Sequence, residues 1–335
     1  MIIESLKKAL SGRHLTEEEA FATFREVMNG EVTGEAVLAA LLTVLQMNGP
    51  DIAEVTGAVR AMRSVCLRVE APEDAVDIVG TGGDGFGTFN VSTTAAIIAA
   101  GAGVVIAKHG NRASTSKSGS ADCLAALGYD LVTPLEDVAR GIRENGIGFL
   151  FANRCHPAMM YAAPVRRALP FRTIFNLIGP LSNPAGVKRY ALGVYAPAII
   201  PLYIGVMKAL GAKKALVFCG PDGLDELGLS GVTRISELSE DGSVKDYMFD
   251  PKRFFGSVRP LAAISGGTPE MNAQITRRVL SGEDRGACRD AAALNAAAAI
   301  VAAGKAGVIE EGIEIAYAAI DNGAALAKLN LLVSH

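Results

Sequence analysis

From Ala75 onward the chain alternates short apolar segments with Ala-rich stretches, and this alternation restricts the fold more than any other feature of its 335 residues. Each apolar segment has the length of one buried strand, and each Ala-rich stretch has the length of a helix. The alternation is typical of a mainly parallel α/β sheet with covering helices. We predict strands at 76–79, 104–107, 148–151, 190–195 and 215–219, and two long Ala-rich helices near 289–303 and 312–326.

The first part of the chain has a helical pattern instead. Thr16 lies three residues before Glu19, which is capping-box spacing, and apolar residues follow at helical intervals. Further helices are predicted near 35–46 and 52–65, followed by a polar segment that contains Pro72. We therefore expect a small N-terminal helical domain over 1–70 and a larger α/β domain over 75–335.

Composition excludes several functional classes. The chain has 32 Lys and Arg against 35 Asp and Glu, whereas a nucleic-acid or membrane-surface binder is usually basic. Its five cysteines form no C-x-x-C pair, so neither a disulfide framework nor a zinc site is predicted. Segment 1–10 carries charges and lacks an apolar core, so no signal peptide is expected and a cytoplasmic location is predicted.

The charges are unevenly distributed along the chain. No Asp or Glu occurs between residues 85 and 121 or between 145 and 221, although both segments contain several Lys and Arg. Two cationic segments in an acidic protein indicate a focused anion site, provided that the fold brings them together.

A glycine-rich segment, Gly80–Gly85, follows the first predicted strand and matches G-x-G-x-x-G. A dinucleotide site would also need an acidic residue about 20 positions later, which is absent here. Glycines also let a polyanion approach backbone N–H groups, although a purely structural turn is equally compatible. The hydroxyls of 92–94 precede an apolar helical run, where they could face a phosphate or act as ordinary caps.

Segment 108–120 combines three cations, one His, five hydroxyl side chains and two glycines after a buried strand. This mixture favours a loop that wraps phosphates, with a solvated basic loop as the alternative.

An acidic cluster, Asp222–Glu226, follows the last predicted strand. Adjacent acids at a strand's carboxyl end commonly hold Mg²⁺, although a solvated acidic turn has the same composition. Within the second cationic segment, His156 and Arg166 could bind a second substrate that carries a carboxylate. No nucleophilic triad, metal-ligating His cluster or Walker A loop is present.

Taken together, these motifs resemble the anthranilate phosphoribosyltransferases of tryptophan biosynthesis. The resemblance rests on G-T-G-G-D at 80–84, N-V-S-T at 90–93, K-H-G-N-R-x-x-x-S at 108–116, G-S-A-D at 119–122, H-P-A-M and P-V-R within 156–166, R-T-I-F-N-x-x-G-P-L-x-N-P at 172–184 and D-G-L-D-E at 222–226. The chain departs from the family at Met160, Pro170 and Cys219, where Lys, Gly and His are frequent.

The resemblance implies the fold of class II nucleoside phosphorylases and a homodimer formed through the helical domain, which helices from about 165–185 would join. It implies Mg²⁺ at Ser92, Asp225 and Glu226, with two ions per subunit, and anthranilate at Gly80, Asn111, His156 and Arg166. The activated sugar, 5-phosphoribosyl 1-pyrophosphate, would contact Gly80, Gly83, Asp84, Thr88, Asn90, Val91, Ser92, Thr93, Lys108, His109, Gly110, Asn111, Arg112, Ala113, Ser114, Thr115, Ser116 and Ser120.

The implied reaction transfers the phosphoribosyl group to the amino group of anthranilate and releases pyrophosphate, the second step from chorismate to tryptophan. No dedicated acid or base is expected, and Lys108 would act electrostatically. Two alternatives share the resembled fold: a pyrimidine nucleoside phosphorylase and a non-catalytic nucleic-acid-binding relative. The acidic motif and the pI of about 5.9 disfavour them, so we expect no nucleic-acid or membrane partner.

Overall fold

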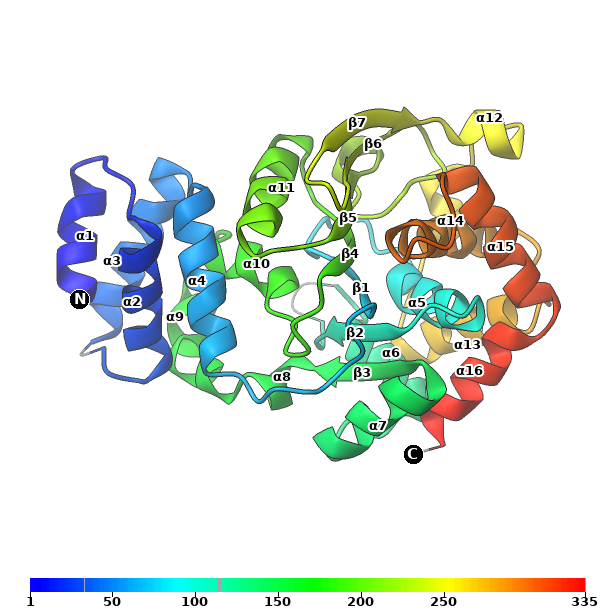
Figure 1. The fold of residues 1–335 in the computed structure, drawn as a ribbon, viewed down its shortest axis with the longest axis horizontal. Coiled ribbons are helices and arrows are strands. Elements are labelled where there is room, and N and C mark those ends of the chain that lie inside the picture. The colour runs from blue at the N-terminus through cyan, green and yellow to red at the C-terminus, as the bar shows by residue number, and fades with distance from the viewer. Residues whose placement is uncertain (33, 114–115, 335) are drawn as a thin grey trace.

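A computed structural model describes residues 1–32, 34–113 and 116–334, and it contains a helical bundle beside an α/β domain (Figure 1). The bundle begins with α1 (Ile2–Leu10), α2 (Glu17–Met28), α3 (Glu35–Asn48) and α4 (Ile52–Ser64). The predicted capping box of Thr16 and Glu19 starts α2. Among the described residues, no helix is long and apolar enough to cross a membrane.

The α/β domain is built on a seven-stranded sheet of order β3-β2-β1-β4-β5-β6-β7. Its first five strands along the chain are parallel and confirm the predicted strands to within about three residues: β1 (Val76–Gly80), β2 (Ile106–Gly110), β3 (Ile147–Phe151), β4 (Arg189–Gly193) and β5 (Lys214–Cys219). The antiparallel edge strands β6 (Thr233–Leu238) and β7 (Val244–Phe249) are additional. The predicted fold class, an α/β domain with a mainly parallel sheet, is therefore confirmed.

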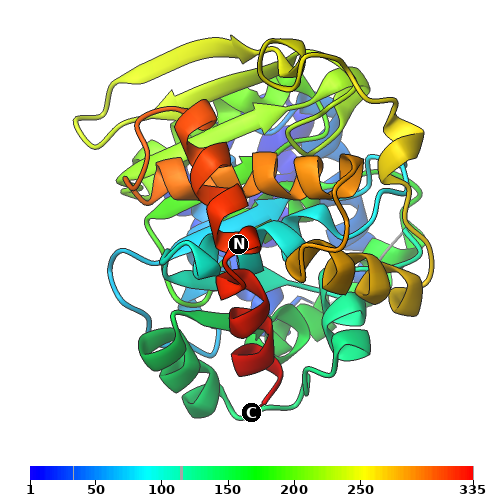
Figure 2. The same ribbon diagram turned by 90° about the vertical axis from the view of Figure 1, so that its right-hand side faces the viewer.

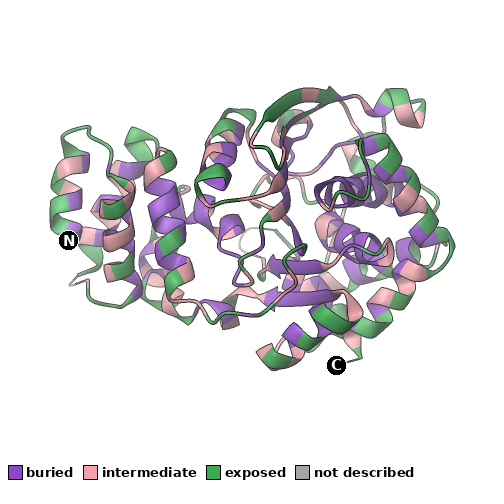
Figure 3. Ribbon diagram, in the orientation of Figure 1, coloured by how far each residue is buried: buried purple, intermediate pink, exposed green. Residues whose placement is uncertain are grey.

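Side chains alternate between the two faces of the sheet, as strand geometry requires. Leu216 and Phe218 of β5 join one hydrophobic core, and Ala215 and Val217 join the other. The first core is covered by α5 (Val91–Gly101), α6 (Ser120–Leu127), α13 (Pro269–Leu280), α14 (Ala287–Ala302), α15 (Ile309–Asp321) and α16 (Ala324–Val333) (Figure 2). Helices α5 and α14 are almost wholly buried (Figure 3).

The predicted single helix at 312–326 is wrong, because the chain breaks it into α15 and α16. Gly323 lies between them with φ 80°, a left-handed conformation that ends one helix and allows a change of direction.

The second core joins the sheet to the helical bundle. It includes residues of α7 (Leu135–Asn145), α10 (Ile174–Ile178) and α11 (Ile200–Ala209) together with residues of α1–α4. Helix α4 packs against α10 and α11, and α9 (Ala163–Ala168) packs against α3. The short helices α8 (Ala152–Cys155) and α12 (Pro251–Phe255) follow β3 and β7.

The chain passes between the sheet of the α/β domain and the helices that pack with the N-terminal bundle three times. These domain crossings run from α4 to β1, from β3 through α8 to α9, and from α10 to β4 (Figure 1). These crossings place residues of the middle of the chain against the N-terminal bundle.

Candidate active site

The predicted phosphate-binding and acidic segments meet at the carboxyl edge of the sheet. The glycine-rich segment follows β1, the basic segment follows β2, and the acidic motif follows β5. Because β2, β1, β4 and β5 are neighbouring parallel strands, their carboxyl ends lie at one edge.

The acidic motif lies directly on the ends of β1 and β4. Asp225 accepts a hydrogen bond of 2.6 Å from the backbone N–H of Gly82, and Glu226 accepts one of 3.2 Å from the N–H of Ser92 at the start of α5. A Cβ on Gly80 or Gly193 would overlap Asp225. Three segments that are distant in sequence therefore form one site.

The carboxylates of this motif are buried together. Asp225 is only 9% exposed, and burial, reinforced by nearby Asp84, raises its pKa to about 7. Burial and the charge of Asp225 raise the pKa of Glu226 well above its ordinary value. Two carboxylates that are buried next to each other repel, and a hard divalent cation bound between their oxygens would relieve that repulsion. The residues therefore fit Mg²⁺.

Lys108 lies beneath this cluster and is 4% exposed. Its ammonium donates to the carbonyl of Ile78 at 2.6 Å, and burial lowers its pKa while Asp77 and Glu226 oppose that shift. It therefore sits as a buried cation between two carboxylates.

Asp77, a buried residue of β1 that belongs to none of the motifs recognised in the sequence, organises the neighbouring backbone. Its carboxylate accepts 3.0 Å and 2.8 Å hydrogen bonds from the N–H of His109 and the side chain of Asn183. Burial raises its pKa to about 6, with Lys108 opposing the rise. Asp77 thereby fixes the end of β2 that carries Lys108 and His109.

The loop after β2 is closed by Asp122 of α6. Asp122 accepts hydrogen bonds from the N–H groups of Ala113 and Gly119, at 2.8 Å and 3.0 Å, and pairs with Arg112 at 2.8 Å. Backbone N–H groups and hydroxyls around Gly110, Ser116 and Ser120 are thus kept at the carboxyl edge. Ser114 and Thr115 lie outside the described residues.

Some predicted contact residues use their side chains within the protein. Asn90 accepts hydrogen bonds from Ser118 and Asn272 through its side chain. Thr88 pairs with Ser265 through its backbone, in an isolated β-bridge. Val91 and Thr93 are buried, so only their backbones at the start of α5 are available to a ligand.

Arg172, which precedes α10, holds the glycine-rich segment. Its guanidinium donates to the carbonyls of Gly82 and Gly83 and stacks 3.8 Å above the ring of Tyr195. The sequence places Arg172 in a motif and in a cationic segment but does not distinguish it from the other cations there. The structure shows that it ties the segment before α10 to the loop after β1.

The residues predicted for a carboxylate-bearing substrate lie between the sheet and the bundle. The rings of His109 and His156 meet edge to face at 5.1 Å, and Asn111 donates to Asn153 at 3.2 Å. Burial lowers the pKa of His156 to about 4, so its ring is neutral at pH 7. The Arg166 guanidinium contacts the ring of Phe175 at 5.2 Å, and no hydrogen bond or ion pair engages that guanidinium within the described part of the chain.

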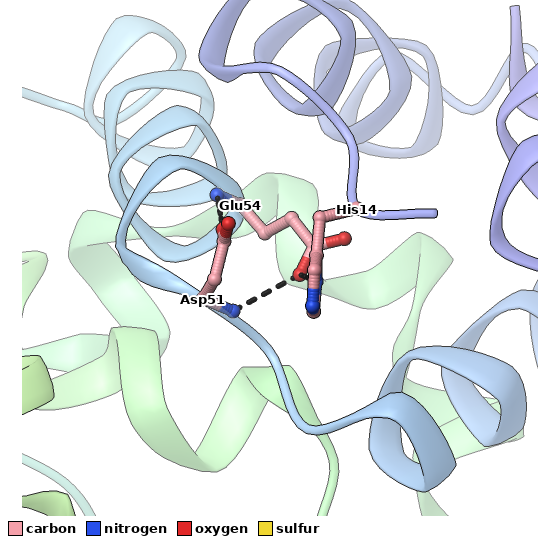
Figure 4. Close-up of side chains that lie close together, drawn as sticks. All are labelled: His14, Asp51 and Glu54. Carbon is pink, nitrogen blue, oxygen red and sulfur yellow. Dashed lines mark hydrogen bonds and ion pairs between the residues drawn. The ribbon is translucent and has the colours of Figure 1, made fainter. Parts of the chain in front are cut away.

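A second group with metal-ligand chemistry, His14, Asp51 and Glu54, lies in the helical bundle (Figure 4). The Glu54 carboxylate already accepts from the N–H groups of Leu15 and Asp51 and contacts the His14 ring at 3.0 Å. Asp51 in turn caps α4. These atoms are occupied in starting the helix, so the group is explained by structure alone.

Comparison with known proteins gives the same two-part division. The α/β domain of a glycosyl transferase family matches residues 72–326, and the helical bundle domain of that family matches residues 3–66. An anthranilate phosphoribosyltransferase of Rubrobacter xylanophilus is 50% identical over 333 residues, which cover 99% of this chain and 97% of that protein.

Solved structures are similarly close. The anthranilate phosphoribosyltransferase of Thermus thermophilus matches with a TM-score of 0.93 and 44% identity over 98% of both chains. The Saccharomyces cerevisiae enzyme in complex with phosphoribosyl pyrophosphate and Mg matches with a TM-score of 0.91 and 29% identity, over 99% of this chain and 96% of that one. The yeast enzyme with 4-fluoroanthranilate matches with a TM-score of 0.89 and 27% identity over the same shares.

Proposed function

Since the chain belongs to the family of anthranilate phosphoribosyltransferases, we propose that the carboxyl edge of its sheet is where it performs the reaction of that family. The enzyme transfers the phosphoribosyl group of phosphoribosyl pyrophosphate to the amino group of anthranilate, in tryptophan biosynthesis. The observation that carries the site assignment is the docking of Asp225 and Glu226 on the glycine-rich segment and on α5.

In the proposed mechanism, the amino nitrogen of anthranilate forms a bond to C1 of the ribose as the bond from C1 to pyrophosphate breaks. An aromatic amine is neutral at pH 7, so the reaction needs no strong base, and its proton leaves to solvent. The N–H groups of the loop after β1 and of the start of α5 would hold phosphate oxygens, as would Arg112 and the hydroxyls of the loop after β2. The buried charge of Lys108 would stabilise negative charge that develops on the departing pyrophosphate.

Ser92, Asp225 and Glu226 are the proposed ligands of Mg²⁺, with two ions per subunit. When bound, Mg²⁺ would neutralise the pyrophosphate and favour its departure. The support is the buried cluster of carboxylates, whose pKa values are raised by burial although Lys108 opposes the rise at Glu226.

Asn111 and Arg166 are the proposed partners of anthranilate, beside Gly80, with the neutral ring of His156 lining the approach. A guanidinium that has no other polar partner within the described residues suits the anthranilate carboxylate. Holding the two substrates in line would supply much of the remaining rate enhancement.

We further propose a cytoplasmic homodimer with domains at 1–70 and 75–335, in which the helical domain and the helices of 165–185 form the contact. Its support is a set of exposed apolar side chains on the bundle: Ile3 and Leu10 lie two turns apart on α1 and are exposed, and Met47 at the end of α3 is 80% exposed. A Leu10→Glu variant should be monomeric by light scattering if this face is the interface, and an unchanged dimer would refute the assignment.

The proposed activity is tested by following anthranilate fluorescence. The signal should fall only when enzyme, phosphoribosyl pyrophosphate and Mg²⁺ are all present. No decrease at any enzyme concentration would contradict the proposal.

A further inference from the structure

A cavity of about 700 Å³ lies at the edge of the sheet opposite the candidate active site. Its walls come from the end of α4, from linker 68–72, from α7 and from segment 183–186, which leads into β4. These elements precede the amino ends of strands, whereas the candidate active site lies at the carboxyl ends. Two of the three chain crossings between the domains therefore line one cavity.

The lining carries an excess of positive charge. It contains the guanidinium groups of Arg63, Arg68 and Arg143 against the single carboxylate of Glu70. Arg63 is already used, because it donates to the carbonyl of Leu181 at 2.6 Å and 2.9 Å.

Arg68 and Arg143 are exposed, and within the described ranges the guanidinium of neither residue makes a hydrogen bond or an ion pair with protein. They come from different elements, the linker and α7, yet line the same cavity. Two guanidinium groups that lack protein partners and line one concave site suit a ligand that carries two negative charges.

The cavity also contacts the polar interior of the sheet. Asn183, one of its lining residues, donates to the buried carboxylate of Asp77, which holds the N–H of His109 at the end of β2. A molecule in the cavity that touched Asn183 would thus be connected through the Asn183–Asp77 hydrogen bond to the backbone of His109 at the active-site edge.

We propose that this cavity, the linker cavity, binds a small organic dianion, either a dicarboxylate or a phosphate monoester, through Arg68 and Arg143. Such a ligand would contact both the α4–β1 crossing and the segment before β4. The inference goes beyond the proposed transferase function, because it concerns a second site at the other end of the strands.

The test is calorimetric titration of the full chain with glutarate and, separately, with glycerol 2-phosphate. Saturating phosphoribosyl pyrophosphate and Mg²⁺, without anthranilate, keep the active-site phosphate positions filled. Wild-type protein should bind at least one probe, and the probe that binds more tightly identifies the ligand class. Arg68→Gln with Arg143→Gln should weaken that binding about tenfold or more.

Arg234→Gln with Arg285→Gln is the matched control, because it removes two exposed charges far from the linker cavity. It should bind the probe as wild type does. Failure of wild type to bind either probe, unchanged affinity in the cavity variant, or equal weakening in the control would each overturn the proposal. Transferase activity is measured separately, so none of these results bears on the proposed function.

Discussion

Gly193, at the carboxyl end of β4, lies directly against the backbone carbonyl of Asp225, so closely that a Cβ would overlap the oxygen. Gly80 on the adjacent strand has the same relationship to the Asp225 carboxylate. Two neighbouring strands therefore end in glycine because the acidic motif rests on them. The position of the proposed metal ligands depends on the absence of these two side chains.

Gly193→Ala should displace the acidic motif and thereby misplace Asp225. Because small displacements in an active site cost about a hundredfold in rate, we expect a loss of kcat/KM of that order. Overpacking should also lower the free energy of unfolding by about 1–3 kcal/mol. Urea unfolding and Mg²⁺-dependent turnover measure the two effects. Gly179→Ala, where a Cβ meets open space, is the control, and equal losses in both variants would contradict this explanation.

Arg172→Ala should release the glycine-rich segment from the segment that precedes α10. We expect KM for phosphoribosyl pyrophosphate to rise about tenfold, since the loop that receives the phosphates loses its charge-assisted bonds. Steady-state kinetics at saturating anthranilate measure this change. Arg167→Ala, an exposed neighbour, should leave KM unaltered, and an unchanged KM in Arg172→Ala would show that these bonds are dispensable.

Much of this arrangement can be predicted from sequence, because the signals are local. The buried strands are short apolar runs, and the glycine-rich, basic and acidic segments that follow β1, β2 and β5 have distinctive compositions. In a parallel sheet the carboxyl ends of neighbouring strands lie at one edge, so the predicted fold class is enough to place those segments together.

Other parts depend on contacts between distant residues. Asp77 is one acid within an apolar strand, and its partner Asn183 lies 106 positions away. The strands β6 and β7 mix charged with apolar residues and pair antiparallel at the edge, so they lack the apolar runs of the buried strands. The interruption at Gly323 was missed because a single glycine within an Ala-rich run is compatible with a continuous helix.

Asp122→Ala should loosen the loop after β2. The substitution removes the acceptor of two backbone N–H groups and the partner of Arg112. We expect KM for phosphoribosyl pyrophosphate to rise about tenfold or more, with faster amide exchange at Ala113 and Gly119. Asp137→Ala, which removes only a surface ion pair, is the control. Unchanged exchange in Asp122→Ala would exclude Asp122 as the residue that organises the loop.

The His14–Glu54 contact predicts a small pH dependence of stability. The hydrogen bond to Glu54 raises the pKa of His14 above its ordinary value of 6.5. The stabilisation is therefore fully present below 6.5 and is lost as the pH rises through the higher pKa of the folded state. Because the ring is partly exposed, the effect should stay under about 1 kcal/mol. Urea unfolding at about pH 5.5 and about pH 8.5 should show a smaller difference in His14→Gln than in wild type, and an identical difference would contradict the assignment.

The central claim is that Asp225 and Glu226 hold the Mg²⁺ that accompanies phosphoribosyl pyrophosphate. It is tested most directly by titrating Mg²⁺ while anthranilate fluorescence is followed, in wild type and in Asp225→Asn with Glu226→Gln. The account predicts that the variant folds, because Asn and Gln keep the side-chain oxygens that accept from Gly82 and Ser92, but that its turnover falls by about a hundredfold or more and no longer saturates with Mg²⁺. Wild-type turnover with an unaltered Mg²⁺ dependence in the variant would contradict the account.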